Sequence, residues 1–136
     1  MTQEKQLRKI IRQLLKEYVS FSDLKDVENY ADSIFSDVGI DVEFTNHFLD
    51  RVNDERNGTD ITPEELKVLY KKAHDKYGTN LSTLKSGSER VVNDTKTDIN
   101  IPVVLNKNGK ESDMVNKTVM RKKNFLTGPN APKLKV

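Results

Sequence analysis

The spacing of apolar residues changes near Gly78 from mainly helical to extended, and this change constrains the fold more than any other feature. Before Gly78 the apolar positions recur every three or four residues, which is the period of amphipathic helices. After Gly78 they form short runs separated by turn signals, which is typical of strands. Helices followed by strands predict an α+β fold, with N-terminal helices packed on a C-terminal antiparallel sheet.

Four helices are predicted before Gly78. The first, near the amino terminus, has an apolar stripe surrounded by basic and polar residues; the stripe consists of Leu7, Ile10, Ile11, Leu14 and Leu15. The strongest local signal is Thr62-Pro63-Glu64-Glu65, in which Thr62 and Glu65 form a capping box and the proline occupies the first turn. The other helices have Ser, Thr or Asn caps and glycine stops. The second, third and fourth helices are expected over residues 20–39, 45–58 and 62–78. A short strand or extended segment is expected over residues 40–44, between the second and the third.

Three strands are expected after Gly78, around Val91-Val92 and over residues 99–105 and 114–121, with a turn at residues 107–110 between the last two. The domain organisation follows from these elements. Residues 1–19 form a basic amphipathic segment that is a candidate targeting signal, residues 20–123 form one α+β domain, and residues 124–136 form an extended tail.

Composition excludes several classes of protein. Without cysteine, the chain has no disulfides, zinc–thiolate sites or thiol nucleophiles. No apolar run approaches the roughly 18 residues that a membrane span needs, so we expect an intracellular protein that does not bind a membrane. No cofactor is indicated, because the six glycines are scattered and form no phosphate-binding loop. No metal site is indicated either, because the histidines and carboxylates lack metal-ligand spacing.

Charge is segregated along the chain. Residues 1–17 hold five basic and two acidic side chains, a net charge of +3, and residues 79–136 hold eleven and five, a net charge of +6. The segment between them, residues 18–78, holds seven basic and fourteen acidic side chains, a net charge of −7. The positive ends predict binding to a polyanion, and the alternative is a solvated lysine-rich surface.

His47 and Arg51 are four residues apart in a predicted helix, which places their side chains next to each other. The two residue types suit phosphodiester cleavage: an imidazole takes a proton near neutral pH, and a guanidinium binds phosphate through parallel hydrogen bonds. The alternative is that His47 packs at the start of the helix, while Arg51 forms an ion pair with Asp50, Asp54 or Glu55.

The segment Phe44-Thr45-Asn46-His47-Phe48-Leu49-Asp50-Arg51 resembles the opening of the early-mRNA endoribonucleases of T4-like phages, relatives of the RelE-type messenger-cleaving toxins. The resemblance covers residues 44–77 by motif and residues 91–123 by strand order. It implies a RelE-like microbial ribonuclease architecture. It also implies a metal-independent endoribonuclease that cleaves single-stranded mRNA through attack of the 2′-hydroxyl, in the cytoplasm of a host cell, with the ribosome as a further partner.

The resemblance also suggests site residues. His47 matches a catalytic histidine of the family, whereas a second family histidine falls at Lys71, with His74 one turn later. Arg121 is the third expected source of positive charge. The expected catalytic residues are therefore His47, Arg51, Lys71, His74 and Arg121, and the expected RNA contacts are Arg56, Lys122, Lys123 and Tyr70, the tyrosine by stacking on a base.

Two other functions stay open. Leu15-Lys16-Glu17 resembles the cleavage signal of phage head-maturation proteases, which indicates a virion protein that binds capsid proteins and has a nuclease-like fold with a cleavable N-terminal segment. The basic surface alone indicates an RNA-binding module without catalysis.

Overall fold

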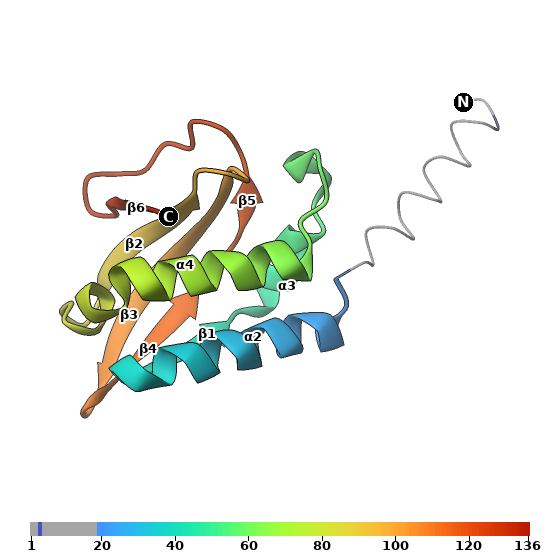
Figure 1. Cartoon of the computed structure of the whole chain (residues 1–136). Helices are drawn as coiled ribbons and strands as arrows, with labels where there is room; N and C mark the ends of the chain where they lie inside the picture. Colours follow the sequence, from blue (N-terminus) through green and yellow to red (C-terminus); the bar gives the residue numbers. More distant parts are fainter. Residues whose placement is uncertain (1–2, 4–18) are drawn as a thin grey trace.

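The computed structural model describes residue 3 and residues 19–136 of the chain. The predicted helix over residues 7–15 and the Leu15-Lys16-Glu17 signal lie outside these residues. Residues 19–136 adopt an α+β fold in which three α-helices precede most of a six-stranded mixed sheet (Figure 1). The predicted fold class is therefore confirmed.

The first two described helices begin at the predicted caps, and the first ends at the predicted glycine, but the second ends at Val52, before the helix stop predicted at Asn57-Gly58. Helix α2 spans Phe21–Phe35 and begins at Ser20, which forms a capping box with Asp23. It ends through a 3-10 turn, η1 (Ser36–Val38), and at Gly39, whose φ of 72° favours glycine. Helix α3 spans Asn46–Val52 and begins at Thr45, and a second 3-10 turn, η2 (Glu55–Asn57), follows it.

Helix α4 spans Pro63–Ser82 and begins at the predicted capping box of Thr62 and Glu65. It continues beyond Gly78, where the sequence predicted its end. Gly78 is buried, and a Cβ atom there would lie 3.3 Å from Cδ2 of His74, so the glycine gives the imidazole room. The next turn buries Leu81, which stabilises the helix past the glycine.

The sheet contains strands β1 (Ile40–Phe44), β2 (Ser88–Asp94), β3 (Ile99–Asn108), β4 (Glu111–Asn116), β5 (Met120–Arg121) and β6 (Lys133–Lys135). Its order is β1-β4-β3-β2-β6, and β5 pairs with β3. Strands β2, β3 and β4 are antiparallel as predicted, but β1 pairs with β4 in parallel and β6 pairs with β2 in parallel. The expectation of a wholly antiparallel sheet was wrong because two distant segments add parallel strands next to β4 and β2.

The predicted strand over residues 114–121 is interrupted by a bulge. Asn116 is opposite Val103 and Met120 is opposite Asn100, so four steps on one strand match three steps on β3. Pro102 lies at this point and has no N–H to donate to the ladder. The strand therefore divides into β4 and β5.

The predicted C-terminal tail belongs to the sheet. Residues 133–135 form β6 beside β2, and the N–H of Val136 donates to the carbonyl of Asn93 at 2.8 Å. The carbonyl of Val136 accepts the N–H of Thr95 at 3.2 Å. The tail is ordered because its backbone satisfies hydrogen bonds that the edge of β2 leaves open.

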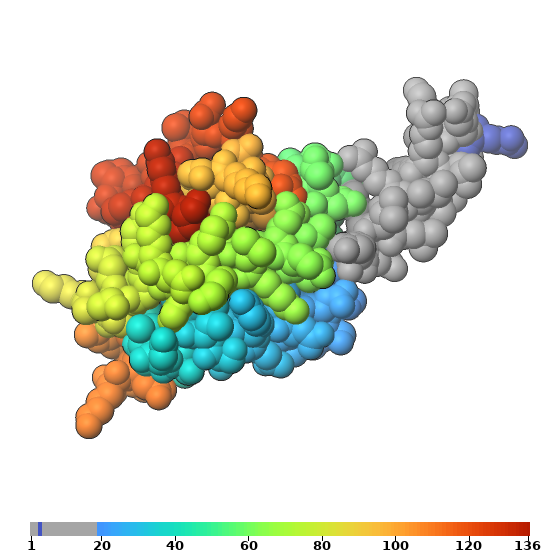
Figure 2. Space-filling view, in the orientation of Figure 1, coloured from blue at the N-terminus to red at the C-terminus, as the bar shows by residue number. Residues whose placement is uncertain are grey.

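The core lies between the sheet and the two long helices, which pack side by side on one of its faces (Figures 1 and 2). Its buried apolar residues come from α2 (Val27, Ala31, Phe35), α4 (Leu66, Leu69, Ala73) and β3 (Ile99, Ile101, Val103, Leu105). None of the helices within residues 19–136 combines the length and apolar character that crossing a bilayer requires.

Helix α2 also closes the outer edge of the sheet. The N–H of Phe44 donates to Oε2 of Glu28 at 2.8 Å, and the N–H of Val42 donates to Oδ1 of Asp32 at 2.9 Å. These carboxylates occupy backbone donors through which another strand would pair with β1. Two of the acidic side chains of α2 thus have a structural role at the sheet edge.

Tyr70 is fully buried, so the prediction that it stacks on an RNA base was wrong. Its hydroxyl donates to Oδ1 of Asn116 at 2.8 Å, and burial raises its pKa well above the usual value. The side-chain amide of Asn116 in turn donates to the carbonyls of Glu43 and Met114, each at 3.0 Å. This network joins α4 to the ends of β1 and β4.

We predict that Tyr70→Phe lowers the free energy of unfolding by about 1–3 kcal/mol, because Oδ1 of Asn116 is then buried without a donor. Urea denaturation measures the change. The matched control is Tyr30→Phe on the half-buried side of α2, which should change stability by less than about 0.5 kcal/mol. Equal effects of the two substitutions would contradict the importance of this hydrogen bond.

Candidate functional site

The start of α3 is fixed where β1 and β4 end. The N–H of Thr45 donates to the carbonyl of Asn116 at 3.3 Å, and its hydroxyl donates to the carbonyl of Lys117 at 2.9 Å. The same hydroxyl oxygen caps α3 by accepting the N–H of Phe48 at 3.2 Å. Because Phe48 and Val52 are buried against the core, the helix presents His47 to solvent.

His47 and Arg51 form the predicted contact on this exposed face. Nε of Arg51 donates a hydrogen bond to Nε2 of His47, with 2.9 Å between the nitrogens. An imidazole nitrogen that accepts a hydrogen bond carries no proton, so the neutral ring holds its hydrogen on Nδ1. The pair therefore places an unprotonated ring nitrogen, whose electron pair accepts the Arg51 hydrogen bond, directly beside a guanidinium.

Asp54 holds Arg51 in this position. Its Oδ2 accepts a hydrogen bond from NH1 of Arg51 at 2.8 Å, and its Oδ1 accepts the N–H of Arg56 at 2.9 Å. The hydrogen bond from the Arg56 backbone, together with the two guanidinium groups, lowers the pKa of Asp54 to about 2. The ion pair that formed part of the alternative interpretation is therefore present, and it coexists with the His47–Arg51 contact.

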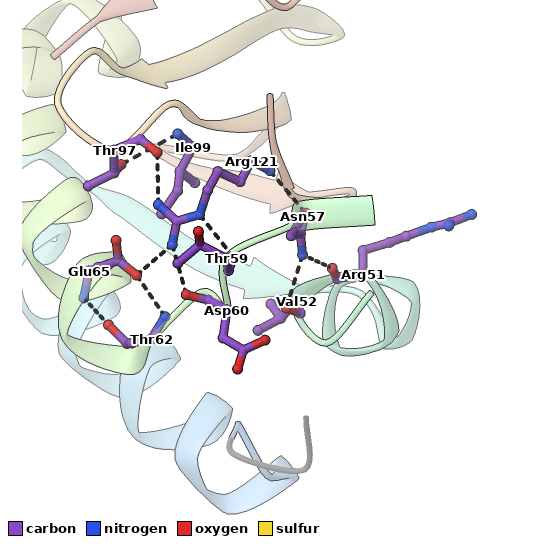
Figure 3. A network of polar contacts seen from close by, with 10 residues as sticks. All are labelled: Arg51, Val52, Asn57, Thr59, Asp60, Thr62, Glu65, Thr97, Ile99 and Arg121. Carbon is purple, nitrogen blue, oxygen red and sulfur yellow. Dashed lines mark hydrogen bonds and ion pairs between the residues drawn. The ribbon is translucent and has the colours of Figure 1, made fainter. Parts of the chain in front are cut away.

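Arg121 lies apart from this pair and is used for structure. Its guanidinium makes four hydrogen bonds, to the carbonyls of Thr59 (3.1 Å), Asp60 (2.8 Å) and Thr97 (2.8 Å) and to the carboxylate of Glu65 (2.8 Å). Only 14% of its side chain is exposed. Figure 3 shows Arg121 directed toward Glu65 and Thr97, whereas the Arg51 side chain points away. The expectation that Arg121 steadies a phosphate was wrong.

Lys71 and His74 lie on α4 and do not join His47. Nε2 of His74 is 2.8 Å from Oδ1 of Asp37 in η1, and its ring meets Phe35 edge-on with the centroids 5.3 Å apart. Nζ of Lys71 donates to Oδ1 of Asp75 at 2.9 Å. The contacts of His74 place it at the C-terminal end of α2, and Lys71 is paired along α4 itself, while α3 lies near the N-terminal end of α2 (Figure 1). The predicted catalytic roles of Lys71 and His74 are therefore not supported by the geometry.

The basic residues expected to contact RNA are exposed. Arg56 follows α3 in η2 and has 64% of its side chain exposed, and Lys122 and Lys123 follow β5 on the surface. The N–H of Arg121 donates to Oδ1 of Asn57 at 3.0 Å, which ties β5 to η2. Strand β5, which precedes Lys122 and Lys123, is thereby attached to η2, the turn that holds Arg56 and follows the helix of His47 and Arg51.

Sequence reasoning missed two residues that position the site. Asn57 is buried and its amide donates to the carbonyls of Arg51 and Val52, at 2.8 and 3.1 Å, which fixes the end of α3. Lys117 accepts the Thr45 hydroxyl through its backbone carbonyl. Asn57-Gly58 was interpreted only as a helix stop, and no local pattern indicates a backbone contact between residues 72 positions apart.

No family model, curated protein or solved structure matches this chain. Within residues 19–136, no group of three or more His, Asp or Glu side chains is arranged to hold a metal ion. The resemblance to the phage endoribonucleases remains a prediction, and the chemistry of the site is argued from its own residues.

We predict that Arg121→Gln lowers the free energy of unfolding by about 2–3 kcal/mol, because it removes the charged hydrogen bonds that join β5 to the start of α4. Chemical denaturation gives the value. Lys123→Gln, which removes an exposed positive charge from the same region, should change stability by less than about 0.5 kcal/mol. A stable Arg121→Gln variant would show that this guanidinium is free for another role.

The His74 contacts predict a pH-dependent contribution to stability. The hydrogen bond with Asp37, and then that with Asp75, raises the pKa of His74 above its ordinary value. A raised pKa in the folded state stabilises the fold below the unfolded pKa, and this contribution is lost as pH rises through the folded pKa. His74→Gln should therefore cost more stability at about pH 5.5 than at about pH 8.5.

Denaturation of both proteins at the two pH values measures this difference. Asp37→Asn should remove most of the pH dependence while His74 is retained, because it deletes the principal partner of the imidazole. A loss of stability on His74→Gln that is larger at the higher pH would contradict the assigned ion pairs.

Proposed function

We propose that this domain is a metal-independent endoribonuclease in which His47 is the general base and Arg51 binds the scissile phosphate of single-stranded RNA. The observation that carries the proposal is the solvent-facing hydrogen bond between Nε of Arg51 and Nε2 of His47. Cleavage by the 2′-hydroxyl needs a base and a positive charge within one site, and this contact supplies both.

The hydrogen bond also suggests how substrate activates the base. In the free protein the electron pair of Nε2 is occupied by Arg51. A phosphate that takes the guanidinium as its bidentate partner leaves Nε2 open to the neighbouring 2′-hydroxyl. His47 then accepts the hydroxyl proton, O2′ forms a bond to phosphorus, and the bond from phosphorus to O5′ breaks. Solvent protonates O5′, and the products are a 2′,3′-cyclic phosphate and a 5′-hydroxyl.

Asp54 and the exposed cations complete this proposal. Asp54 keeps its negative charge at neutral pH, since its pKa is about 2, and it anchors Arg51 through NH1 while Nε turns to substrate. Arg56 in η2 and Lys122 and Lys123 after β5, the strand that contacts η2, are exposed positive charges to which RNA phosphates flanking the cleaved bond would bind.

A non-catalytic RNA-binding module is the second candidate function, and the exposure of Arg56, Lys122 and Lys123 favours it. Such binding would depend on salt and not on His47. The virion-protein alternative depends on residues outside the described part of the chain, and it stays a prediction from the sequence.

The test is cleavage of end-labelled single-stranded RNA by the purified full chain in EDTA. We expect products that end in a 2′,3′-cyclic phosphate, and no cleavage of DNA of the same sequence because it lacks the 2′-hydroxyl. His47→Gln should lower the rate by about 10²–10⁴-fold, the usual contribution of a general base. His74→Gln is the matched control, since it changes the other histidine of the chain, and it should cleave like the unchanged protein.

Intact RNA with the unchanged protein would refute the nuclease, and equal rates for His47→Gln and the unchanged protein would refute the assigned base. RNA binding without cleavage, weakened by salt and by Lys122→Gln, would instead support the binding module.

A further inference from the structure

Two adjoining hollows lie between α2 and α3 and form a groove. One hollow of about 450 Å³ is lined by residues of α2, of α3 and of the end of β1, among them Leu24, Phe44 and Leu49. A second hollow of about 490 Å³ shares Phe21, Leu49 and Asp50 with the first. We call this surface the α2–α3 groove. Its lining combines apolar side chains with the charged residues Lys25, Glu28 and Asp50, and Phe21 is 69% exposed, so the groove presents some apolar surface to solvent.

The groove has the form that receives a helix. Its α2 wall consists of Phe21, Leu24, Lys25 and Glu28, which recur at helical spacing along one face. Amphipathic helices bind such grooves through apolar residues at positions i, i+3, i+4 and i+7. Phe21 to Glu28 spans about 11 Å along a helix axis, at about 1.5 Å per residue.

We propose that the amphipathic segment of this same chain, residues 5–16, binds the α2–α3 groove. Its apolar stripe, from Leu7 to Leu15, has the required spacing and would extend about 12 Å as a helix, which matches the length of the α2 wall. When bound, the apolar side chains of the stripe would cover the exposed ring of Phe21 and the side chain of Leu49.

The position of the segment in the chain supports binding within one molecule. Val19 and Ser20 line the second hollow, so the described residues 19–136 begin at the groove itself. From Leu15 to Val19 the chain can span about 13 Å, at about 3.3 Å per residue. That length exceeds the 8–10 Å between the axes of packed helices, and it permits the chain to reverse direction.

Charge is complementary as well. Residues 1–17 carry a net charge of +3, whereas residues 18–78, which include both helices of the groove, carry −7. Glu28 is paired with Lys25 at 2.7 Å. Asp50 is an exposed carboxylate at the groove, next to where the basic side chains flanking the stripe would lie. This acidic surface favours the basic segment over a polyanion.

Paramagnetic relaxation in the full chain tests the proposal. The protein has no cysteine, so Gln13→Cys accepts a single nitroxide on the polar side of the segment. We expect loss of the amide signals of Leu24, Glu28, Leu49 and Asp50, and no loss for residues 133–135 of β6. A sample in which isotope-labelled chains without cysteine are mixed with nitroxide-bearing chains should show no loss, because the contact is within one molecule.

Two matched substitutions test whether the apolar stripe causes the loss of the groove signals. Ile11→Asp should restore the groove signals, because it places a carboxylate in the stripe, whereas Gln6→Asp adds the same charge beside the stripe and should leave the signal loss unchanged. Asp50→Lys should restore the signals in part. Groove signals that are unaffected by the nitroxide, or equally affected in the Ile11→Asp chain, would overturn the proposal. Signal loss in the mixed sample would assign the groove to a second copy and overturn it equally.

Discussion

The side chains of Asn57 and Arg121 join the end of α3 and the turn η2 to β5 and to the start of α4, and the position of the candidate site depends on them. Asn57 binds the backbone at the end of α3 and accepts the N–H of Arg121, while the Arg121 guanidinium binds the connection that leads into α4 (Figure 3). Buried polar groups of this kind are stable only when every partner is in place. The network therefore fixes one arrangement of α3, η2 and the start of α4 against β5.

This arrangement decides which cations can act on a ligand. Arg121 is committed to carbonyl groups and to Glu65, whereas Arg51 and Arg56 stay at the surface and share Asp54. His47 faces the same surface because Phe48 and Val52 turn the opposite side of α3 into the core. The imidazole of His47 and the guanidinium of Arg51 therefore form a pair that Asp54 supports. This pair is separate from His74 on α4.

Features set by neighbouring residues were predictable from the sequence. The cap at Ser20, the capping box at Thr62 and the turn at Gly109 follow from backbone chemistry within a few residues, and the His47–Arg51 contact follows from one helical turn. Features set by distant residues were not predictable. The bulge opposite Pro102, the pairing of β6 with β2 and the burial of Arg121 each depend on contacts between segments far apart in the sequence. The sequence Arg121-Lys122-Lys123 does not indicate whether the arginine faces solvent or binds a loop, because both arrangements have the same local pattern.

The proposed function requires that Nε2 of His47 is an unprotonated acceptor held beside Arg51. Long-range ¹H–¹⁵N correlation spectra of the imidazole, recorded at alkaline pH, report directly which ring nitrogen carries the hydrogen in the neutral form. We expect the Nδ1–H tautomer for His47, and a shift toward the other tautomer in Arg51→Ala, where the donor is absent. A predominant Nε2–H tautomer in the unchanged protein would contradict it, because Arg51 then has no electron pair on Nε2 to which it can donate.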